Sequence, residues 1–254
     1  MDKWYEVPGK AGTNVIYSRV RLVRNLKEYP FPGRLTKEQS AELSEKLLGG
    51  LTGIASMDRM QYRFTHLERM GDLEKTALLE RRAINRSVIK KKDPTGMILS
   101  EDESTAILLN GDDHVRIQTL QTGLTLEQLY ERADKIDDYI SERFDYAFDE
   151  KYGYLTSFPT NVGTGLRAAV VLHLPMLSKN KNFNSLVADM GRFGTQVRGV
   201  YGEGAENFGS LYQISNQKTL GQTEREIIDI VRKAALELEC EEIENYIENI
   251  ADGL

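Results

Sequence analysis

The chain has 254 residues, of which 40% are apolar and 28% charged, and a formal net charge of −6 at pH 7. These values are typical of a globular domain with its own hydrophobic core, and the negative charge argues against nucleic acid as a partner. The one cysteine, Cys240, excludes an intrachain disulfide, and the three histidines are too far apart in sequence to indicate a zinc site. The longest apolar stretch, residues 168–177, is too short to span a bilayer, and the N-terminus resembles no signal peptide. We therefore expect a cytoplasmic protein with no membrane partner.

The first half of the chain contains strand-like and helix-like segments. Residues 14–24 alternate and are rich in β-branched side chains, which predicts a strand. A helix is expected from Thr36 to about Leu48, because Thr36 and Gln39 can form a capping box and two glycines follow. A second helix is expected over about residues 72–84, and the lysine cluster 90–94 predicts an exposed loop.

The second half begins with a hairpin signal. Residues 105–110 and 114–120 predict two strands joined by the turn 111–113. Capping boxes at Thr125 and Thr223 predict the starts of two long helices. Between them we expect a strand over 168–174, a helix over 183–193 and a strand-like region that glycines interrupt. Strands grouped between helices, without strict βαβ alternation, predict an α+β fold with an antiparallel β-sheet flanked by α-helices.

Five arginines stand at strand ends or beside turns, namely Arg19, Arg21, Arg116, Arg167 and Arg198. Arg19 and Arg21 are two residues apart, so on a strand they share a face. A guanidinium is always charged and binds phosphate oxygens through a bidentate fork. Each arginine taken alone is more often a solvated surface charge. The segments around them favour a triphosphate site.

These segments resemble the signatures of the ATP:guanidino phosphotransferase (phosphagen kinase) family. Residues 159–168, PTNVGTGLRA, resemble the family's C-P-(S/T)-N-x-G-T-x-x-R-A, and residues 110–117, NGDDHVRI, resemble its N-E-E-D-H-x-R-I. SRVR at 18–21 resembles its first phosphate-binding segment, and RGVYGE at 198–203 with ISN at 214–216 resembles its last. Within the family, TNVGTGLR, YGEG and QISNQ are most similar to the branch that phosphorylates arginine residues of bacterial proteins.

The resemblance implies a glutamine-synthetase-like catalytic domain that uses ATP and Mg²⁺ and transfers the γ-phosphoryl group to arginine residues in proteins. Glu203 and Asp112 match the carboxylate pair that orients the acceptor guanidinium and accepts its proton. Without the resemblance, Asp112 is a turn former and Glu203 an exposed loop charge. No side chain is implied as a metal ligand. The implied ATP-binding positions are Ser18, Arg19, Val20, Arg21, Arg116, Arg167, Ala168, Ala169, Val170, Val171, Arg198, Gly199, Val200, Tyr201 and Gly202.

The chain departs from the family pattern at two positions. Phe158 stands where the family has a cysteine, and Asp112, one methylene shorter, stands where it has a glutamate. Two alternatives to a protein-arginine kinase therefore stay open: a catalytically impaired pseudokinase that binds ATP and regulates a partner, and a kinase for a small free guanidino compound. His114, inside the family motif, either contacts the nucleotide or has a structural role.

The domain organisation is expected to be simple. Residues 1–254 read as a single catalytic domain, because the first arginine segment begins near residue 15 and leaves no room for the N-terminal helical domain of small-guanidine kinases. The C-terminal helical domain of the protein-arginine branch is expected to be absent or truncated. The expected partners are protein substrates with an exposed arginine, and a homodimer or a regulatory partner stays open.

Overall fold

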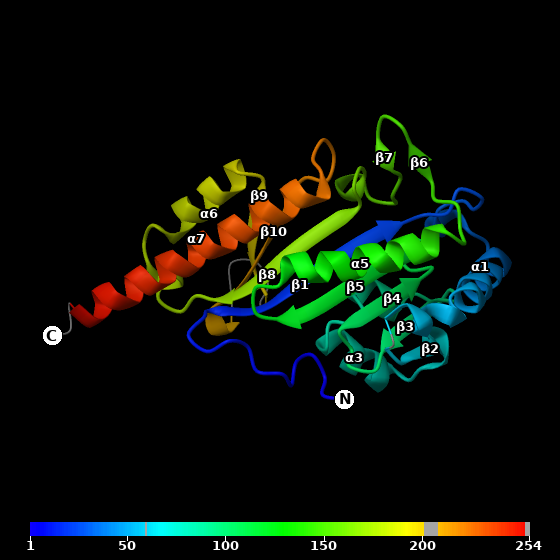
Figure 1. Ribbon diagram of the computed structural model, residues 1–254, viewed down its shortest axis with the longest axis horizontal. Coiled ribbons are helices and arrows are strands. Elements are labelled where there is room, and N and C mark those ends of the chain that lie inside the picture. Colours follow the sequence, from blue (N-terminus) through cyan, green and yellow to red (C-terminus); the bar gives the residue numbers. More distant parts are fainter. Residues whose placement is uncertain (59, 201–207, 252–254) are drawn as a thin grey trace.

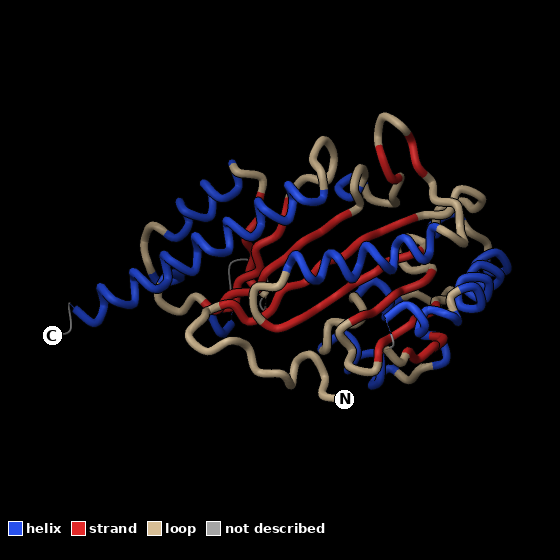
Figure 2. Tube along the Cα trace, in the orientation of Figure 1, coloured by secondary structure: helices blue, strands red, loops and turns tan. Residues whose placement is uncertain are grey.

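The computed structural model describes residues 1–58, 60–200 and 208–251. Its centre is an eight-stranded sheet in which all neighbouring strands are antiparallel, in the order β2-β3-β4-β5-β1-β8-β10-β9 (Figures 1 and 2). A separate small hairpin is formed by β6 (Phe148–Asp149) and β7 (Gly153–Tyr154). The sheet strands are β1 (Val15–Arg24), β2 (Tyr62–His66), β3 (Gly96–Ser100), β4 (Thr105–Leu109), β5 (Val115–Thr122), β8 (Leu166–His173), β9 (Thr195–Gly199) and β10 (Leu211–Asn216).

Helices cover one face of this sheet (Figure 1). The main core lies between them and the strands, where Leu22 of β1 and Val170 of β8 are fully buried with Ile136 of α5 and Val231 of α7. The opposite face carries α3 and α4 over β3 and β4 at one side only. The helices are α1 (Lys37–Gly50), α2 (Ala55–Asp58), α3 (Asp72–Glu80), α4 (Arg86–Lys90), α5 (Leu126–Ser141), α6 (Phe183–Arg192) and α7 (Glu224–Ala251). No helix among the described residues has the length and apolarity needed to cross a membrane.

The α+β fold and its antiparallel sheet confirm the expectation from sequence. The capping boxes at Thr36 and Thr223 form, since each threonine accepts a hydrogen bond from the third helical N–H and the glutamine or glutamate there accepts from the threonine N–H. The box at Thr125 does not form. Its N–H donates to Ser18 Oγ at 3.1 Å instead, so a contact from β1 replaces the local one.

Other expectations need adjustment. The helix expected over 72–84 ends at Glu80, because Arg82 adopts a positive φ of 68°. The loop expected over 90–94 begins one residue later, since α4 extends to Lys90. Strands β2 and β3 were not expected. The sequence of β3, GMILS, is buried throughout and therefore lacks the alternation that marks a half-buried strand.

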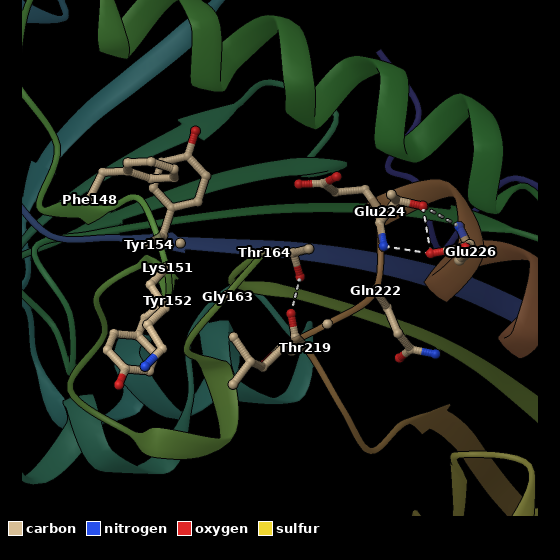
Figure 3. A pocket seen from close by; sticks show the side chains of 14 residues that line it. Phe148, Lys151, Tyr152, Tyr154, Gly163, Thr164, Thr219, Gln222, Glu224 and Glu226 are labelled. Carbon is tan, nitrogen blue, oxygen red and sulfur yellow. Dashed lines mark hydrogen bonds between the residues drawn. The ribbon is translucent and has the colours of Figure 1, made fainter.

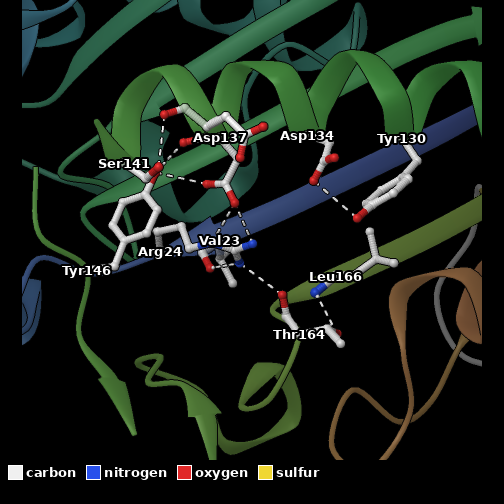
Figure 4. A network of polar contacts seen from close by, with 10 residues as sticks. Val23, Arg24, Tyr130, Asp134, Asp137, Ser141, Tyr146, Thr164 and Leu166 are labelled. Carbon is white, nitrogen blue, oxygen red and sulfur yellow. Dashed lines mark hydrogen bonds and ion pairs between the residues drawn. The ribbon is translucent and has the colours of Figure 1, made fainter. Parts of the chain in front are cut away.

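A buried ion pair joins α5 of the main helix layer to β1 in the interior of the sheet (Figure 4). Arg24, at the end of β1, donates from Nε and Nη2 to Asp137 Oδ2 of α5 at 3.0 and 2.7 Å. Its Nη1 donates to the carbonyl oxygen of Thr164 at 2.9 Å, and the Tyr154 ring lies 3.6 Å from the guanidinium carbon. A Cβ on Gly165 would come within 2.6 Å of Nη1, so the close approach requires glycine there. The pair thus fixes the loop that leads into β8.

Candidate functional site

The strand register brings the five arginines to one face of the sheet. Residues paired across antiparallel strands project to the same side. Arg21 of β1 pairs with Arg167 of β8 and with Gln118 of β5, which is two residues from Arg116. Further along the sheet, beyond β8, Gln213 of β10 pairs with both Val171 of β8 and Arg198 of β9, so Arg198 projects from the same face.

This surface, which we call the arginine face, is the one opposite the main helix layer, because the intervening Val20 and Leu22 point into that layer. It is bordered by two apolar clusters. At one side, Leu78 and Val88 of α3 and α4 pack on the strand β3–β4 surface. At the other, Trp4 and Tyr17 pack with Leu120 and Val171. The arginines therefore lie on the sheet between these two apolar clusters.

The arginine face concentrates positive charge. Burial lowers the pKa of Arg116 to about 10, and the neighbouring charge of Arg19 acts in the same direction. Burial also holds the pKa of Arg21 well below its ordinary value, with further lowering by Arg116, Arg19 and Arg167. Among the described residues, no carboxylate forms an ion pair with any of the five. A cluster of this kind is suited to bind a polyanion.

Neutral groups orient two of these guanidinium groups. Arg19 Nη2 donates to the side-chain oxygen of Gln213 at 2.8 Å, and Arg167 Nη1 donates to the carbonyl oxygen of Asn216 at 2.8 Å. The Asn216 side chain in turn accepts from Ala168 N at 2.9 Å and donates to Leu166 O at 3.0 Å. These contacts fix the directions of the Arg19 and Arg167 guanidinium groups and leave their positive charge available to a ligand.

The remaining positions that were expected to bind ATP lie in several places. Ala169 and Val171 lie on the arginine face with Arg167, and Gly199 and Val200 follow Arg198 at the end of β9. The side chains of Val20, Ala168 and Val170 belong to the core under the helices, and Ser18 Oγ donates to Gly123 O at 2.7 Å. Tyr201, Gly202 and Glu203 lie outside the described residues.

Asp112 lies in the β4–β5 turn, at the edge of the arginine face. Its Oδ2 accepts hydrogen bonds from Asn85 Nδ2 and Ser87 Oγ, both at 2.9 Å. Its negative charge opposes the lowering of the pKa of Arg21 and Arg116 by burial. The site therefore places one held carboxylate beside the cluster of guanidinium groups.

The residues after Asp112 build the turn itself. Asp113 Oδ1 accepts from Asn25 Nδ2 and from the backbone N–H of Ser157, both at 2.7 Å. His114 Nδ1 accepts from Leu26 N at 2.9 Å, and burial lowers the pKa of its ring to about 4. The fully buried His114 thus has a structural contact in place of the alternative contact with a nucleotide.

The segment before β8 is held from both sides. Thr219, which sequence reasoning did not single out, accepts from Thr164 N at 2.9 Å and donates from Oγ1 to the carbonyl oxygens of Thr160 and Val162 at 3.1 and 2.7 Å. A Cβ on Gly163, whose φ is 110°, would come within 2.3 Å of Thr219 O. Phe158, 51% exposed, stands at the start of this clamped loop.

The described residues contain no group of three histidine, cysteine, aspartate or glutamate side chains that could hold a metal ion. Protein side chains there do not form a cage for Mg²⁺. A magnesium ion that arrives bound to a nucleotide needs few protein ligands, because phosphate oxygens and water supply most of its coordination.

Comparison with known proteins gives consistent matches. The sequence pattern of the ATP:guanido phosphotransferase C-terminal catalytic domain matches residues 45–244. A protein-arginine kinase of Clostridium kluyveri is 42% identical over 229 residues, which are 90% of this chain and 66% of that protein. One of Desulforamulus reducens is 40% identical over 246 residues, with 95% and 68% covered. The chain spans about two thirds of the length of these curated relatives.

Solved structures share the fold. The crystal structure of lombricine kinase superimposes with a TM-score of 0.79 at 24% identity, covering 93% of this chain and 68% of that one. The duplicated taurocyamine kinase of Schistosoma mansoni, with bound transition-state analogue components, superimposes with a TM-score of 0.79 at 28% identity, covering 90% and 33%.

Proposed function

Because the chain belongs to the ATP:guanido phosphotransferase family, we propose that it transfers the γ-phosphoryl group of ATP to the guanidinium of arginine residues in proteins. The observation that carries this proposal is the arginine face, a set of guanidinium groups with no carboxylate partner among the described residues, beside the held carboxylate of Asp112. The relatives named protein-arginine kinase support the choice of acceptor.

The arginine face would hold the nucleotide. Phosphoryl transfer depends mainly on positioning and on neutralising the charge of the phosphate oxygens. Arg21, Arg116 and Arg167 lie nearest the end of the sheet that carries Asp112, and Arg19 and Arg198 extend the positive surface away from it. Mg²⁺ enters as part of the substrate MgATP, where it neutralises part of the phosphate charge.

Asp112 would receive the acceptor. An arginine side chain is a poor nucleophile while protonated, because its pKa is about 12.5–13.8. A carboxylate that accepts a hydrogen bond from the guanidinium orients it and takes one proton as the new N–P bond forms and the bond from the γ-phosphorus to the ADP oxygen breaks. We propose Glu203 as the second carboxylate of this pair. The reaction would take place in the cytoplasm, where ATP and protein substrates meet.

The test is a phosphoarginine assay. Purified protein is incubated with MgATP and a basic protein substrate, and phosphoarginine is identified by mass spectrometry under neutral conditions. We expect product with the wild type and none with Arg167→Ala. Arg192→Ala, at an exposed arginine of α6 paired with Asp189, is the matched control and should keep full activity. ATP binding without product would support a pseudokinase, and product only with free arginine would support a small-guanidine kinase.

A further inference from the structure

A cavity of about 410 Å³ opens beside the small β6–β7 hairpin (Figure 3). Three aromatic rings line it, those of Phe148, Tyr152 and Tyr154. Phe148 is 58% exposed and Tyr152 46%, so both rings are accessible to a ligand. Exposed rings around a cavity of this size are typical of ligand recognition. We call this cavity the hairpin pocket.

The charge of the hairpin pocket favours a cation. Glu224 and Glu226, on the first turn of α7, line it together with Lys151. Glu226 is engaged in the capping box with Thr223, whereas Glu224 makes no hydrogen bond or ion pair with another described residue. With two carboxylates at this helix start, an anion would be repelled. A free carboxylate beside aromatic rings is instead the combination that binds guanidinium or ammonium groups.

Two of these rings already have a cation of the chain itself over one face. The Arg24 guanidinium carbon lies 3.6 Å from the centre of the Tyr154 ring, and Lys151 Nζ lies 5.0 Å from that of Tyr152. Phe148 meets Tyr154 edge to face, with ring centres 5.2 Å apart, so the wall of the pocket is preorganised. A second cation entering beside Glu224 would meet a wall that is already shaped for it.

The hairpin pocket adjoins the end of the sheet where the acceptor would bind. Gly163 and Thr164 of its wall lie four and three residues before Arg167, and Thr219 lies three residues after Asn216, whose carbonyl oxygen accepts from Arg167. The Asp112 turn is at this same end, since β5 begins there and pairs with the last residues of β1. The pocket includes the start of α7 in the main helix layer, whereas the Asp112 turn borders the arginine face, so one extended substrate segment that passes around this end of the sheet would occupy both places.

We propose that the hairpin pocket binds a second basic side chain of the protein substrate, a few residues from the arginine that is phosphorylated. This inference rests on the proposed function and names the substrate class, which is segments with clustered basic residues. Arginine is the preferred occupant, because its planar guanidinium stacks on aromatic rings and pairs with a carboxylate through two hydrogen bonds. Lysine would fit the same charge with a weaker stacking contact.

The experiment compares peptides of about fifteen residues. Each has one target arginine and, two to six residues away on either side, arginine, lysine or citrulline, which has nearly the shape of arginine without its charge. Phosphoarginine formation gives KM and kcat, and fluorescence anisotropy of labelled peptides without ATP gives Kd. The protein variants are Glu224→Gln and Tyr152→Leu, with Glu150→Gln, an exposed hairpin residue outside the pocket wall, as the matched control.

For wild type we expect the second arginine to lower KM and Kd about 3- to 10-fold relative to citrulline at the best spacing, with kcat unchanged. Glu224→Gln and Tyr152→Leu should remove this advantage, and Glu150→Gln should keep it. An advantage that persists in Glu224→Gln, or none at any spacing in wild type, overturns the pocket. If no peptide is phosphorylated but anisotropy shows the Glu224-dependent preference, the pocket stands and the proposed function falls.

Discussion

Replacement of Arg116 by methionine should make the protein more stable and a weaker binder of ATP. Arg116 is 7% exposed, its Nε has no hydrogen-bond partner among the described residues, and no described carboxylate forms an ion pair with it. Burial lowers its pKa to about 10 from 12.5. At about 1.4 kcal/mol for each tenfold change in proton affinity, holding the charge in the fold costs about 3 kcal/mol. Only the charged form of Arg116 carries this cost. The loss of stability is therefore fully present below about pH 10 and shrinks as the pH rises toward 12.5.

Arg116→Met removes this charge and keeps an unbranched side chain that reaches about as far as the arginine Nε. After loss of some contacts, we expect a gain of about 1–3 kcal/mol in the free energy of unfolding at pH 7. For a chain of this size that corresponds to a melting temperature about 2–12 °C higher. Loss of one charge-assisted contact to phosphate costs about 1.5–3 kcal/mol, so the Kd for ATP should rise about 10- to 100-fold.

Thermal unfolding measures the first effect and calorimetric titration with MgATP the second. Arg192→Met, at a side chain that is 81% exposed, is the control and should change neither. If Arg116→Met lowers the melting temperature of the ligand-free protein, the charge is compensated within the fold and the reasoning is refuted. Unchanged ATP affinity would remove Arg116 from the nucleotide site.

Three further predictions concern the supporting groups. Asp137→Ala leaves the Arg24 charge buried without its partner and should lower the unfolding free energy by about 3–5 kcal/mol in urea titrations, whereas a change below about 1 kcal/mol would show that water replaces the carboxylate. Asp112→Asn should reduce kcat about 10²- to 10⁴-fold in the phosphoarginine assay with little change in ATP affinity, and full activity would point to another base. Burial lowers the pKa of His114 to about 4, so the folded state excludes a proton that the unfolded chain binds near pH 6.5. Stability should therefore fall by about 3 kcal/mol between pH 6.5 and 4, and His114→Gln should flatten this slope in denaturant titrations at both pH values.

Local signals in the sequence were sufficient for the elements that are determined locally. The capping boxes at Thr36 and Thr223 form within four residues of chain, and the pairing of Arg19 with Arg21 on one face follows from strand geometry. The capping box predicted at Thr125 does not form, because Ser18, a residue distant in sequence, supplies the acceptor for the Thr125 N–H. A local rule cannot anticipate a partner that only the tertiary fold brings near.

The same distinction separates the parts of the site. The arginines and Asp112 are recognisable in short motifs, but the groups that hold them are scattered along the chain. Asn85, just before α4, and Ser87, within α4, donate hydrogen bonds to Asp112. Thr219, which follows β10, donates to the loop before β8. Polar residues of these types are common in loops, and no spacing indicates which of them will bond to a site residue.

Strand β1 pairs with β5 on one side and β8 on the other along nearly its whole length. Backbone amides in such a position exchange with solvent only when the whole domain opens. Arg19 and Arg21 thus lie on an interior strand of the sheet, and Arg116 and Arg167 lie on the two strands that pair with it. Arg198 differs, because β9 is an edge strand and its side chain is exposed. A bound polyanion would therefore contact four arginines on interior strands and one exposed arginine, Arg198, on an edge strand. We expect Arg198 to be the arginine that changes position between different bound states.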